Sequence, residues 1–203
     1  MKDIFSQFFR LLELTLVSPQ LALFYLTTSK KLIESDVERW VTIFGWKESS
    51  KQVNLLTLIS RNLEFRNLYY YRISKGSIYA RILMRIIYPE CPSLFIDPSC
   101  NIGKGLFIQH GFSTIIMADI GENCWINQQV SIGYKDKAGC PKIANNVRIT
   151  AGAKVLGNIN LGNNVTVGAN AVVTKDVPAN CVVVGIPAYI IKRDGLKVKE
   201  ELV

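Results

Sequence analysis

The sequence predicts an α+β protein made of two successive regions that fold in different ways. In residues 1–90, apolar side chains recur every three and four positions, which is typical of amphipathic helices. In residues 91–193, charges thin out, glycine and asparagine become frequent, and the apolar period changes to six residues. A strict period of six matches neither a helix nor a simple strand, and it indicates a solenoid. Residues 194–203 are predicted to form a C-terminal tail.

The first region contains four or five predicted helices. Its apolar spacing is clearest in two sets of residues: Ile4, Phe8, Leu11 and Leu12, and then Leu55, Leu58, Ile59 and Leu63. Pro19 should end the first apolar stretch, and Ser35–Glu38 has the serine and the early acidic residues of a helix start. Gly76 and Pro89 interrupt the later stretch.

The six-residue period of the second region is kept by aliphatic residues with one substitution, Thr114. The repeating position holds Ile96, Ile102, Ile108, Thr114, Ile120, Ile126 and Ile132, and then Ile143, Ile149, Val155, Leu161, Val167 and Val173. Three repeats make one triangular coil, and each coil buries its aliphatic side chains against the coil before it. Glycines that follow this position, such as Gly103 and Gly121, and the frequent asparagines are expected to supply turns with unusual backbone angles.

The period slips once, between Ile132 and Ile143, which are eleven residues apart. Residues 134–141 are therefore predicted to leave the coil as a protruding loop. Loops that leave a rigid scaffold often carry function.

Composition argues against several classes of protein. The net charge is +8, but the basic residues are scattered and no nucleic-acid recognition motif appears, so we expect a small anionic ligand and no nucleic acid. The five cysteines form no CxxC pair, which argues against a zinc site and a disulfide framework and suits the reducing cytoplasm. No apolar run has the length of a membrane span, and no secretory signal precedes the first helix.

The second half also contains a series of specific motifs. They are Ile96–Pro98, Ile102–Gly105, Gln109–Gly111, Pro141–Ile143, Ala151–Ile159, Val173–Pro178 and Val184–Ala188. Through these motifs, residues 94–193 resemble the hexapeptide-repeat acetyltransferases, and most of all the serine acetyltransferase family. The resemblance implies a left-handed parallel β-helix, acetyl-CoA as donor, no metal, and a homotrimer with active sites between adjacent subunits.

His110 is the only histidine of the chain, and it matches the family's catalytic histidine. A neutral imidazole can take the proton of an acceptor hydroxyl while that oxygen attacks a thioester carbonyl. Asn127 is a candidate donor to the resulting oxyanion. The acidic residue that orients the family's histidine is Phe95 here, and Asp97 is its candidate substitute because side chains two apart on a strand point the same way.

The acceptor side departs from the family pattern. An acidic residue that binds serine in the family is Gln109 here, and an Arg-His pair is Gly139-Cys140. We therefore expect Gln109, Asn127 and Cys140 to contact the acceptor. A nucleophilic role for Cys140 is disfavoured because the family transfers the acetyl group directly. The lost charges would pair with a zwitterion, so the sequence favours a neutral sugar hydroxyl over serine.

The resemblance places acetyl-CoA at the last coils. Residues that match the donor channel of related galactoside and maltose acetyltransferases are Ala151, Ala169, Thr174 and Lys175. The arginine that the family carries near the end of the β-helix is Tyr189 here, and Lys192 and Arg193 are candidate replacements that could meet phosphate.

These features favour an acetyl-CoA-dependent O-acetyltransferase acting on a sugar or a polysaccharide precursor, of a capsule, an O-antigen or an exopolysaccharide. One alternative is a serine O-acetyltransferase of cysteine biosynthesis, although Glu200–Val203 is not the isoleucine-ending tail by which that family binds its partner enzyme. A non-catalytic β-helix scaffold is an alternative of another class. The apolar segment Ile4–Leu26 leaves peripheral membrane contact open.

Overall fold

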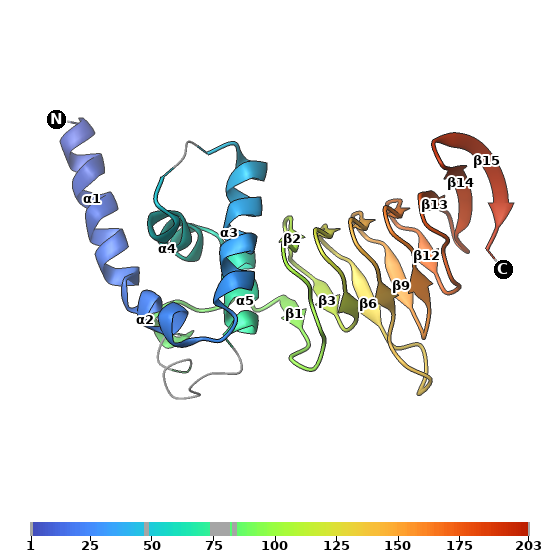
Figure 1. Cartoon of the computed structure of the whole chain (residues 1–203), viewed down its shortest axis with the longest axis horizontal. Helices are drawn as coiled ribbons and strands as arrows, with labels where there is room; N and C mark the ends of the chain where they lie inside the picture. The colour runs from blue at the N-terminus through green and yellow to red at the C-terminus, as the bar shows by residue number, and fades with distance from the viewer. Residues whose placement is uncertain (1, 47–48, 74–81, 83–84, 203) are drawn as a thin grey trace. The chain divides into compact units, whose positions relative to one another are not determined.

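The computed structural model describes residues 2–46, 49–73, 82 and 85–202, and only the backbone of residues 2–6. The chain forms two compact units, Met1–Cys91 and Pro92–Val203, which are described separately (Figure 1). The boundary between the units coincides with the change of apolar period in the sequence.

The first unit contains five helices whose bounds the structure describes. They are α1 (Lys2–Val17), α2 (Pro19–Leu26), α3 (Lys30–Phe44), α4 (Lys51–Arg61) and α5 (Leu63–Arg72). Pro19 lies in the first turn of α2, where a missing N–H leaves no hydrogen bond unmade, so the chain breaks at Ser18 as predicted. The side chains of Ser50 and Asn62 accept hydrogen bonds from the first turns of α4 and α5. The predicted interruption at Gly76 lies outside the described residues.

The predicted helix start at Ser35–Glu38 is wrong, because this segment lies inside α3. The Ser35 hydroxyl donates to the carbonyl of Lys31 one turn earlier and caps nothing. Ile33, Val37 and Trp40 form a buried stripe that continues through the segment and holds it in the helix. The helix ends at Gly45, whose φ of 62° suits glycine.

The core of the first unit combines large aromatic residues with paired charges. Trp40, Tyr69 and Tyr70 are almost completely buried. Arg72 Nε donates to Asp36 Oδ2 at 2.8 Å, and both side chains are buried, so each offsets the desolvation of the other.

Along α1, Phe8, Leu11 and Leu16 are exposed. Among the described residues, no single helix has the length and apolarity to cross a membrane, whereas residues 7–17 and α2 together meet these two criteria as a pair bent by 44°.

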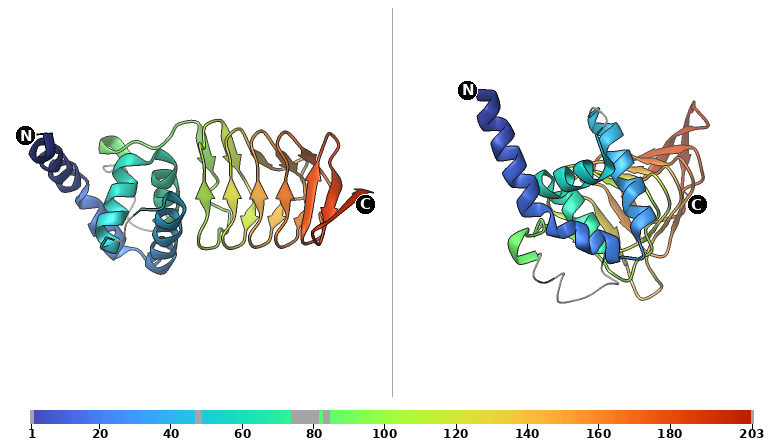
Figure 2. Two further views of the ribbon diagram at one scale, coloured as in Figure 1. Left: turned by 90° about the horizontal axis from the view of Figure 1, so that it is seen from above. Right: turned by 60° about the vertical axis from the view of Figure 1, so that its left-hand side comes forward.

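The second unit is a solenoid of parallel strands that stack into three sheets (Figures 1 and 2). Sheet A contains β1 (Leu94–Ile96), β3 (Thr114–Ile116), β6 (Ser131–Gly133), β9 (Lys154–Leu156) and β12 (Val172–Val173). Sheet B contains β4 (Asp119–Ile120), β7 (Lys142–Ile143) and β10 (Asn160–Leu161). Sheet C contains β2 (Phe107–Ile108), β5 (Trp125–Ile126), β8 (Arg148–Ile149), β11 (Thr166–Val167), β13 (Cys181–Val184), β14 (Tyr189–Arg193) and β15 (Leu196–Glu201).

Each coil visits sheets A, B and C in turn, so the solenoid has three edges where the chain changes sheet. The AB edge comprises residues 97–101, 117–118, 134–141, 157–159 and 174–176. The BC edge comprises residues 103–106, 121–124, 144–147, 162–165 and 178–180. The CA edge comprises residues 109–113, 127–130, 150–153 and 168–171. The predicted loop at 134–141 is the longest of the AB connections (Figure 1).

The aliphatic repeat forms the core, with one difference from the predicted register. Ile126, Ile149 and Val167 are buried and pair with one another across sheet C. In sheet A, however, Ile132 pairs with Ile116, whereas Thr114 pairs with Leu94. Thr114 is buried but does not hold the repeat position, because the CA connection before β3 is two residues longer than the later ones.

The glycines act differently from the expectation. Gly103 and Gly121 do not have positive φ; a Cβ on Gly103 would lie 2.7 Å from the backbone of Gly121, so glycine here allows adjacent coils to approach. The expectation holds for asparagine, because at the BC edge left-handed turns are made by residues with φ near 60°: Asn123, Asn146, Asn164 and Asn180.

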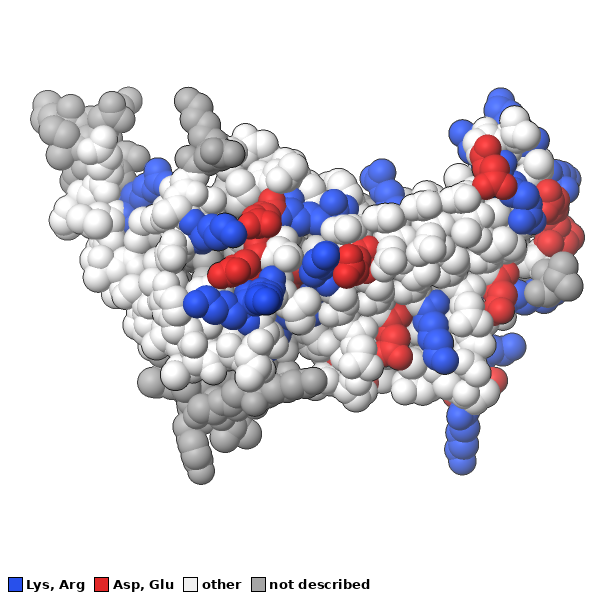
Figure 3. All heavy atoms as spheres, in the orientation of Figure 1, with Lys and Arg blue, Asp and Glu red and all other residues white. Residues whose placement is uncertain are grey.

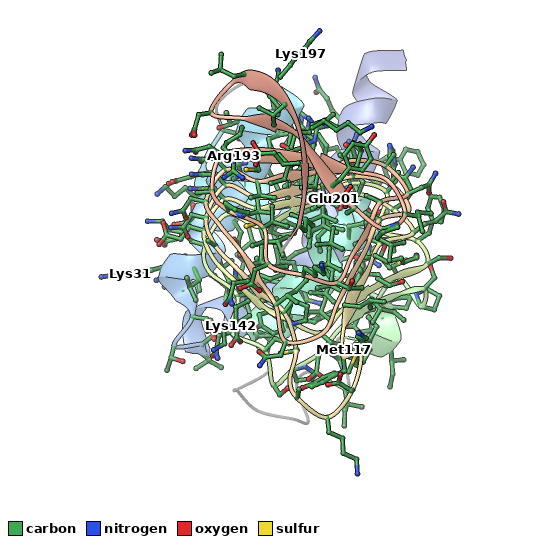
Figure 4. The ribbon with its side chains drawn as sticks, turned by 90° about the vertical axis from the view of Figure 1, so that its right-hand side faces the viewer. Lys31, Met117, Lys142, Arg193, Lys197 and Glu201 are labelled. Atoms are coloured by element: carbon green, nitrogen blue, oxygen red, sulfur yellow. The ribbon has the colours of Figure 1, made fainter. Side chains whose placement is uncertain are left out.

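Residues 194–203 do not form a free tail. Residues 196–201 form β15, which pairs antiparallel with β14 and extends sheet C. Lys197, near the tip of this hairpin, points away from the coils (Figure 4). The side chain of Leu202 is buried, and this burial fixes the end of the strand.

Candidate active site

His110 lies on the first connection of the CA edge and is exposed. Eight residues separate the paired positions Ile108 and Ile116, whereas six separate Ile126 from Ile132. The two additional residues lie around His110, whose φ is 52° and whose carbonyl accepts a hydrogen bond from Phe112 N at 2.8 Å. The histidine therefore stands on an enlarged turn that the stacking of coils does not require.

The CA edge also collects two of the predicted donor residues. Gln128, Ala151 and Ala169 follow His110 in successive coils, and backbone hydrogen bonds connect the edge: Gly152 N donates to Gln128 O, and Asn170 N donates to Ala151 O. The structure thus places His110, Ala151 and Ala169 along one line. The small side chains leave room beside the backbone, which a long, narrow ligand requires.

Gln109 and Asn127 come together beside His110. Asn127 Nδ2 donates to Gln109 Oε1 at 3.1 Å, and the indole Nε1 of Trp125 donates to the same oxygen at 3.2 Å. One N–H of Asn127 is therefore occupied, which limits its predicted role as an oxyanion donor. Its Oδ1 is buried without a hydrogen-bond partner in the described structure.

Asp97 does not meet His110 within the chain. It lies at the AB edge, where its Oδ1 accepts hydrogen bonds from Ser99 N at 2.8 Å and Ser99 Oγ at 2.7 Å. Sheet A separates this turn from the CA edge. The sequence argument compared positions along one strand, but the coil places the two residues on different edges.

Cys140 is half-buried in the long loop at the AB edge. Electrostatic repulsion from Cys140 and a hydrogen bond with it raise the pKa of Tyr134. Burial, followed by the nearby Asp97 carboxylate, raises the pKa of the Cys100 thiol to about 11. The Cys100 thiol, at the AB edge, therefore stays protonated near neutral pH. Cys140 is not at the same edge as Gln109 and Asn127.

The remaining predicted donor residues lie at the AB edge and near the C-terminus. Thr174 and Lys175 follow β12, and Lys175 Nζ donates to the carbonyl of Leu202 at 2.8 Å. Arg193 Nε and Nη2 donate to Glu200 Oε2 across the terminal hairpin, and this bond raises the arginine pKa. Lys192 is exposed on β14. Of these three cationic side chains, Lys175 and Arg193 are thus already hydrogen-bonded to groups of the same chain.

A groove of about 800 Å³ lies over the outer face of sheet B, beneath β15. Its lining includes Asp119, Lys142, Asp176 and Arg193, and of the predicted site residues it contains only Arg193. On the face shown in Figure 3, Lys and Arg side chains alternate with Asp and Glu and form no continuous basic stripe.

The sequence argument missed two residues in β5 and β8, the strands next to β2 in sheet C. Trp125 and Arg148 precede the buried Ile126 and Ile149 in sheet C, so their side chains lie on the outer face. The Arg148 guanidinium lies 4.8 Å from the centre of the Trp125 ring. The signal was present in the repeat, because a large aromatic and a cation occupy equivalent outward positions in adjacent coils.

No family model matches the chain. Curated relatives match about half of it. A serine acetyltransferase of Synechococcus elongatus is 47% identical over 108 residues, which are 51% of this chain and 44% of the relative. A serine acetyltransferase of Staphylococcus aureus is 48% identical over 108 residues, 51% of each protein. The chain thus spans about half the length of the curated relatives it matches.

Solved structures match more of the chain. The serine acetyltransferase of Neisseria gonorrhoeae has a TM-score of 0.67 and 29% identity, covering 88% of this chain and 70% of that one. A serine acetyltransferase in complex with CoA has a TM-score of 0.63 and 26% identity, covering 81% and 70%. These matches confirm the predicted α+β fold with a left-handed β-helix.

The prediction of a sugar acceptor, and with it a place in polysaccharide biosynthesis, is wrong. The relatives that are 47–48% identical to this chain over 108 residues are serine acetyltransferases. The substitutions at Gln109 and Gly139-Cys140 were given more weight than the similarity around them. The second half of this chain is a hexapeptide-repeat left-handed β-helix that is similar, in sequence and in structure, to those of serine acetyltransferases.

Proposed function

We propose that this chain is an acetyl-CoA-dependent serine O-acetyltransferase. The identity of 47–48% over 108 residues of the β-helix carries the proposal. The arrangement of the CA edge supports it, because an exposed histidine and two small residues lie along one line there.

In the proposed reaction, His110 accepts the proton of the serine hydroxyl while that oxygen attacks the thioester carbonyl of acetyl-CoA. The carbon–sulfur bond then breaks, the acetyl group stays on the serine oxygen, and the protonated imidazole returns its proton to the leaving thiolate. Binding both substrates along one edge makes the attack effectively intramolecular. Ala151 and Ala169 would flank the narrow pantetheine arm.

The proposed active form is a homotrimer. The predicted site residues are divided between the CA edge, with His110, Ala151 and Ala169, and the AB edge, with Thr174, Lys175 and the loop 134–141. Sheet A, with strands of two or three residues, lies between these edges, so one chain does not bring them together. The AB edge of a second copy, placed against the CA edge of the first, would complete the site. Analytical ultracentrifugation should give three times the mass of the chain.

The test is an assay of free thiol release with acetyl-CoA and L-serine. We expect release that depends on both substrates, with O-acetylserine as the product identified by mass spectrometry. Release at the same rate without serine, or the absence of product, contradicts the proposal. A protein that is folded and trimeric but inactive would favour the scaffold alternative.

A further inference from the structure

The outer face of sheet C carries a polar cluster next to His110 that the reaction described above does not use. Phe107, Trp125 and Arg148 occupy equivalent positions in three adjacent strands. Gln109 and Asn127 directly follow β2 and β5, and their side chains lie on the side of Trp125, because Trp125 Nε1 and Asn127 Nδ2 both donate to Gln109 Oε1. The Trp125 ring is packed edge-on against Phe107, with centroids 4.7 Å apart, and this contact fixes its orientation.

Trp125 determines which end of the Gln109 amide is free. An indole N–H can only donate, so the atom that faces it must be the oxygen, and Asn127 Nδ2 donates to that same oxygen. The two N–H groups of Gln109 Nε2 therefore point elsewhere. No hydrogen bond from Nε2 occurs among the described residues. Gln109 thus presents a donor directly beside the candidate base.

Arg148 adds a positive charge to the same platform. Its guanidinium lies over the Trp125 ring, and no carboxylate pairs with it among the described residues. Stacking on an indole restricts the side chain while leaving its N–H groups available. A neutral donor and a guanidinium, both positioned by one indole, match the two oxygens of a carboxylate.

We propose that Gln109 and Arg148, positioned by Trp125, bind the carboxylate of the acceptor and determine its specificity. This proposal rests on the proposed function for the identity of the acceptor as an amino acid. It explains how a chain with Gln109 and Gly139-Cys140, in place of the family's charged residues, can still recognise a zwitterion. The buried, unpartnered Asn127 Oδ1 is an acceptor that the ammonium group could satisfy after a small rotation.

The test compares L-serine with L-serinamide, which lacks the negative charge. In Arg148→Met we expect kcat/KM for serine to fall about 10- to 100-fold, the effect of losing a charged hydrogen bond, with little change for serinamide. Gln109→Glu should have the same effect, because it replaces the free donor by a negative charge. Arg148→Lys keeps the positive charge, so it should retain part of the preference for serine over serinamide that Arg148→Met loses. Lys197→Met removes a distant cation and is the control.

A second measurement separates this proposal from the proposed function. The indole N–H signal of Trp125, assigned with Trp125→Phe, should shift in NMR spectra when serine is added, and this shift should disappear in Arg148→Met. Suppose that Arg148→Met and Gln109→Glu still turn over serine, with an unchanged ratio of kcat/KM for serine to kcat/KM for serinamide. This result overturns the carboxylate site and leaves the proposed function intact. A serine-dependent shift without turnover overturns the proposed function alone. If neither turnover of serine nor a serine-dependent shift is observed, the proposed function and the carboxylate site are both wrong.

Discussion

The CA and BC edges of the β-helix have similar backbones and different side chains. Both place left-handed residues in successive coils, such as Asn146, Asn164 and Asn180 at the BC edge, and Gln129, Gly152 and Asn170 at the CA edge. At the BC edge the amides form a ladder, in which Asn146 donates to Asn164 at 3.2 Å, Asn164 to Asn180 at 2.8 Å, and Asn180 to Asp194 at 2.9 Å.

Among its described residues, the CA edge has a single such amide pair, Asn127 with Gln109, and no continuous ladder; it also carries His110, Gln128, Ala151 and Ala169. At both edges, backbone hydrogen bonds in the turns hold adjacent coils together. The side chains of an edge are therefore available either to stabilise the stack or to form a binding site. The BC edge uses its amides for stacking. The CA edge leaves an exposed imidazole, small residues and an enlarged turn.

The largest expected effect tests the chemical role of the CA edge. In His110→Asn, thiol release with serine should fall about 10²- to 10⁴-fold, because the general base is lost. Asparagine tolerates the left-handed φ of 52°, so the urea midpoint of unfolding should not change. Full activity of His110→Asn would contradict a catalytic role for the CA edge.

A smaller effect tests whether the small residues of the CA edge make room for the donor. In Ala169→Leu, the KM for acetyl-CoA should rise about tenfold or more, because the added methyl groups fill space beside the edge. Ala179→Leu makes the same change at an exposed residue of the BC edge and should leave this KM unaltered. Equal effects of the two substitutions on KM would contradict the assignment.

The stability of the two edges can be compared directly with matched asparagines. Asn164→Ala and Asn170→Ala both place alanine at a φ near 60°. Only Asn164 takes part in two amide hydrogen bonds with its neighbours in the ladder. The free energy of unfolding, measured with urea, should therefore fall by about 1 kcal/mol more for Asn164→Ala than for Asn170→Ala. The comparison fails if Asn170→Ala is the more destabilising of the two.

The smallest effect concerns pH. Burial raises the pKa of the Cys181 thiol, next to the BC edge. Because the thiol ionises at a lower pH in the unfolded chain, stability should decline as pH rises through the unfolded pKa and stop declining above the folded pKa. Cys181→Ala should make the urea midpoint less sensitive to pH in the alkaline range. An unchanged slope would show that another group controls alkaline unfolding.

The identity of the site could be predicted from single residues only in part. The repeat and its motifs led to His110, Ala151 and Ala169, and the structure places these on one edge. They also led to Asp97, which lies on another edge and is bonded to Ser99. The sugar prediction failed because the substitution at Gln109 was given more weight than the similarity of the surrounding sequence to serine acetyltransferases.

The sequence by itself determined the two regions, the β-helix and most of its core. The aliphatic position recurs every six residues within a coil, and residues such as Ile126, Ile149 and Val167 pair with their equivalents in adjacent coils, so the pattern is local and visible. Only the tertiary structure decided that Ile116 replaces Thr114 in the register, that residues 196–201 form a strand, and which way the Gln109 amide faces. These features depend on the length of each connection and on which side chains then meet across adjacent coils. The residues of a single repeat do not determine either.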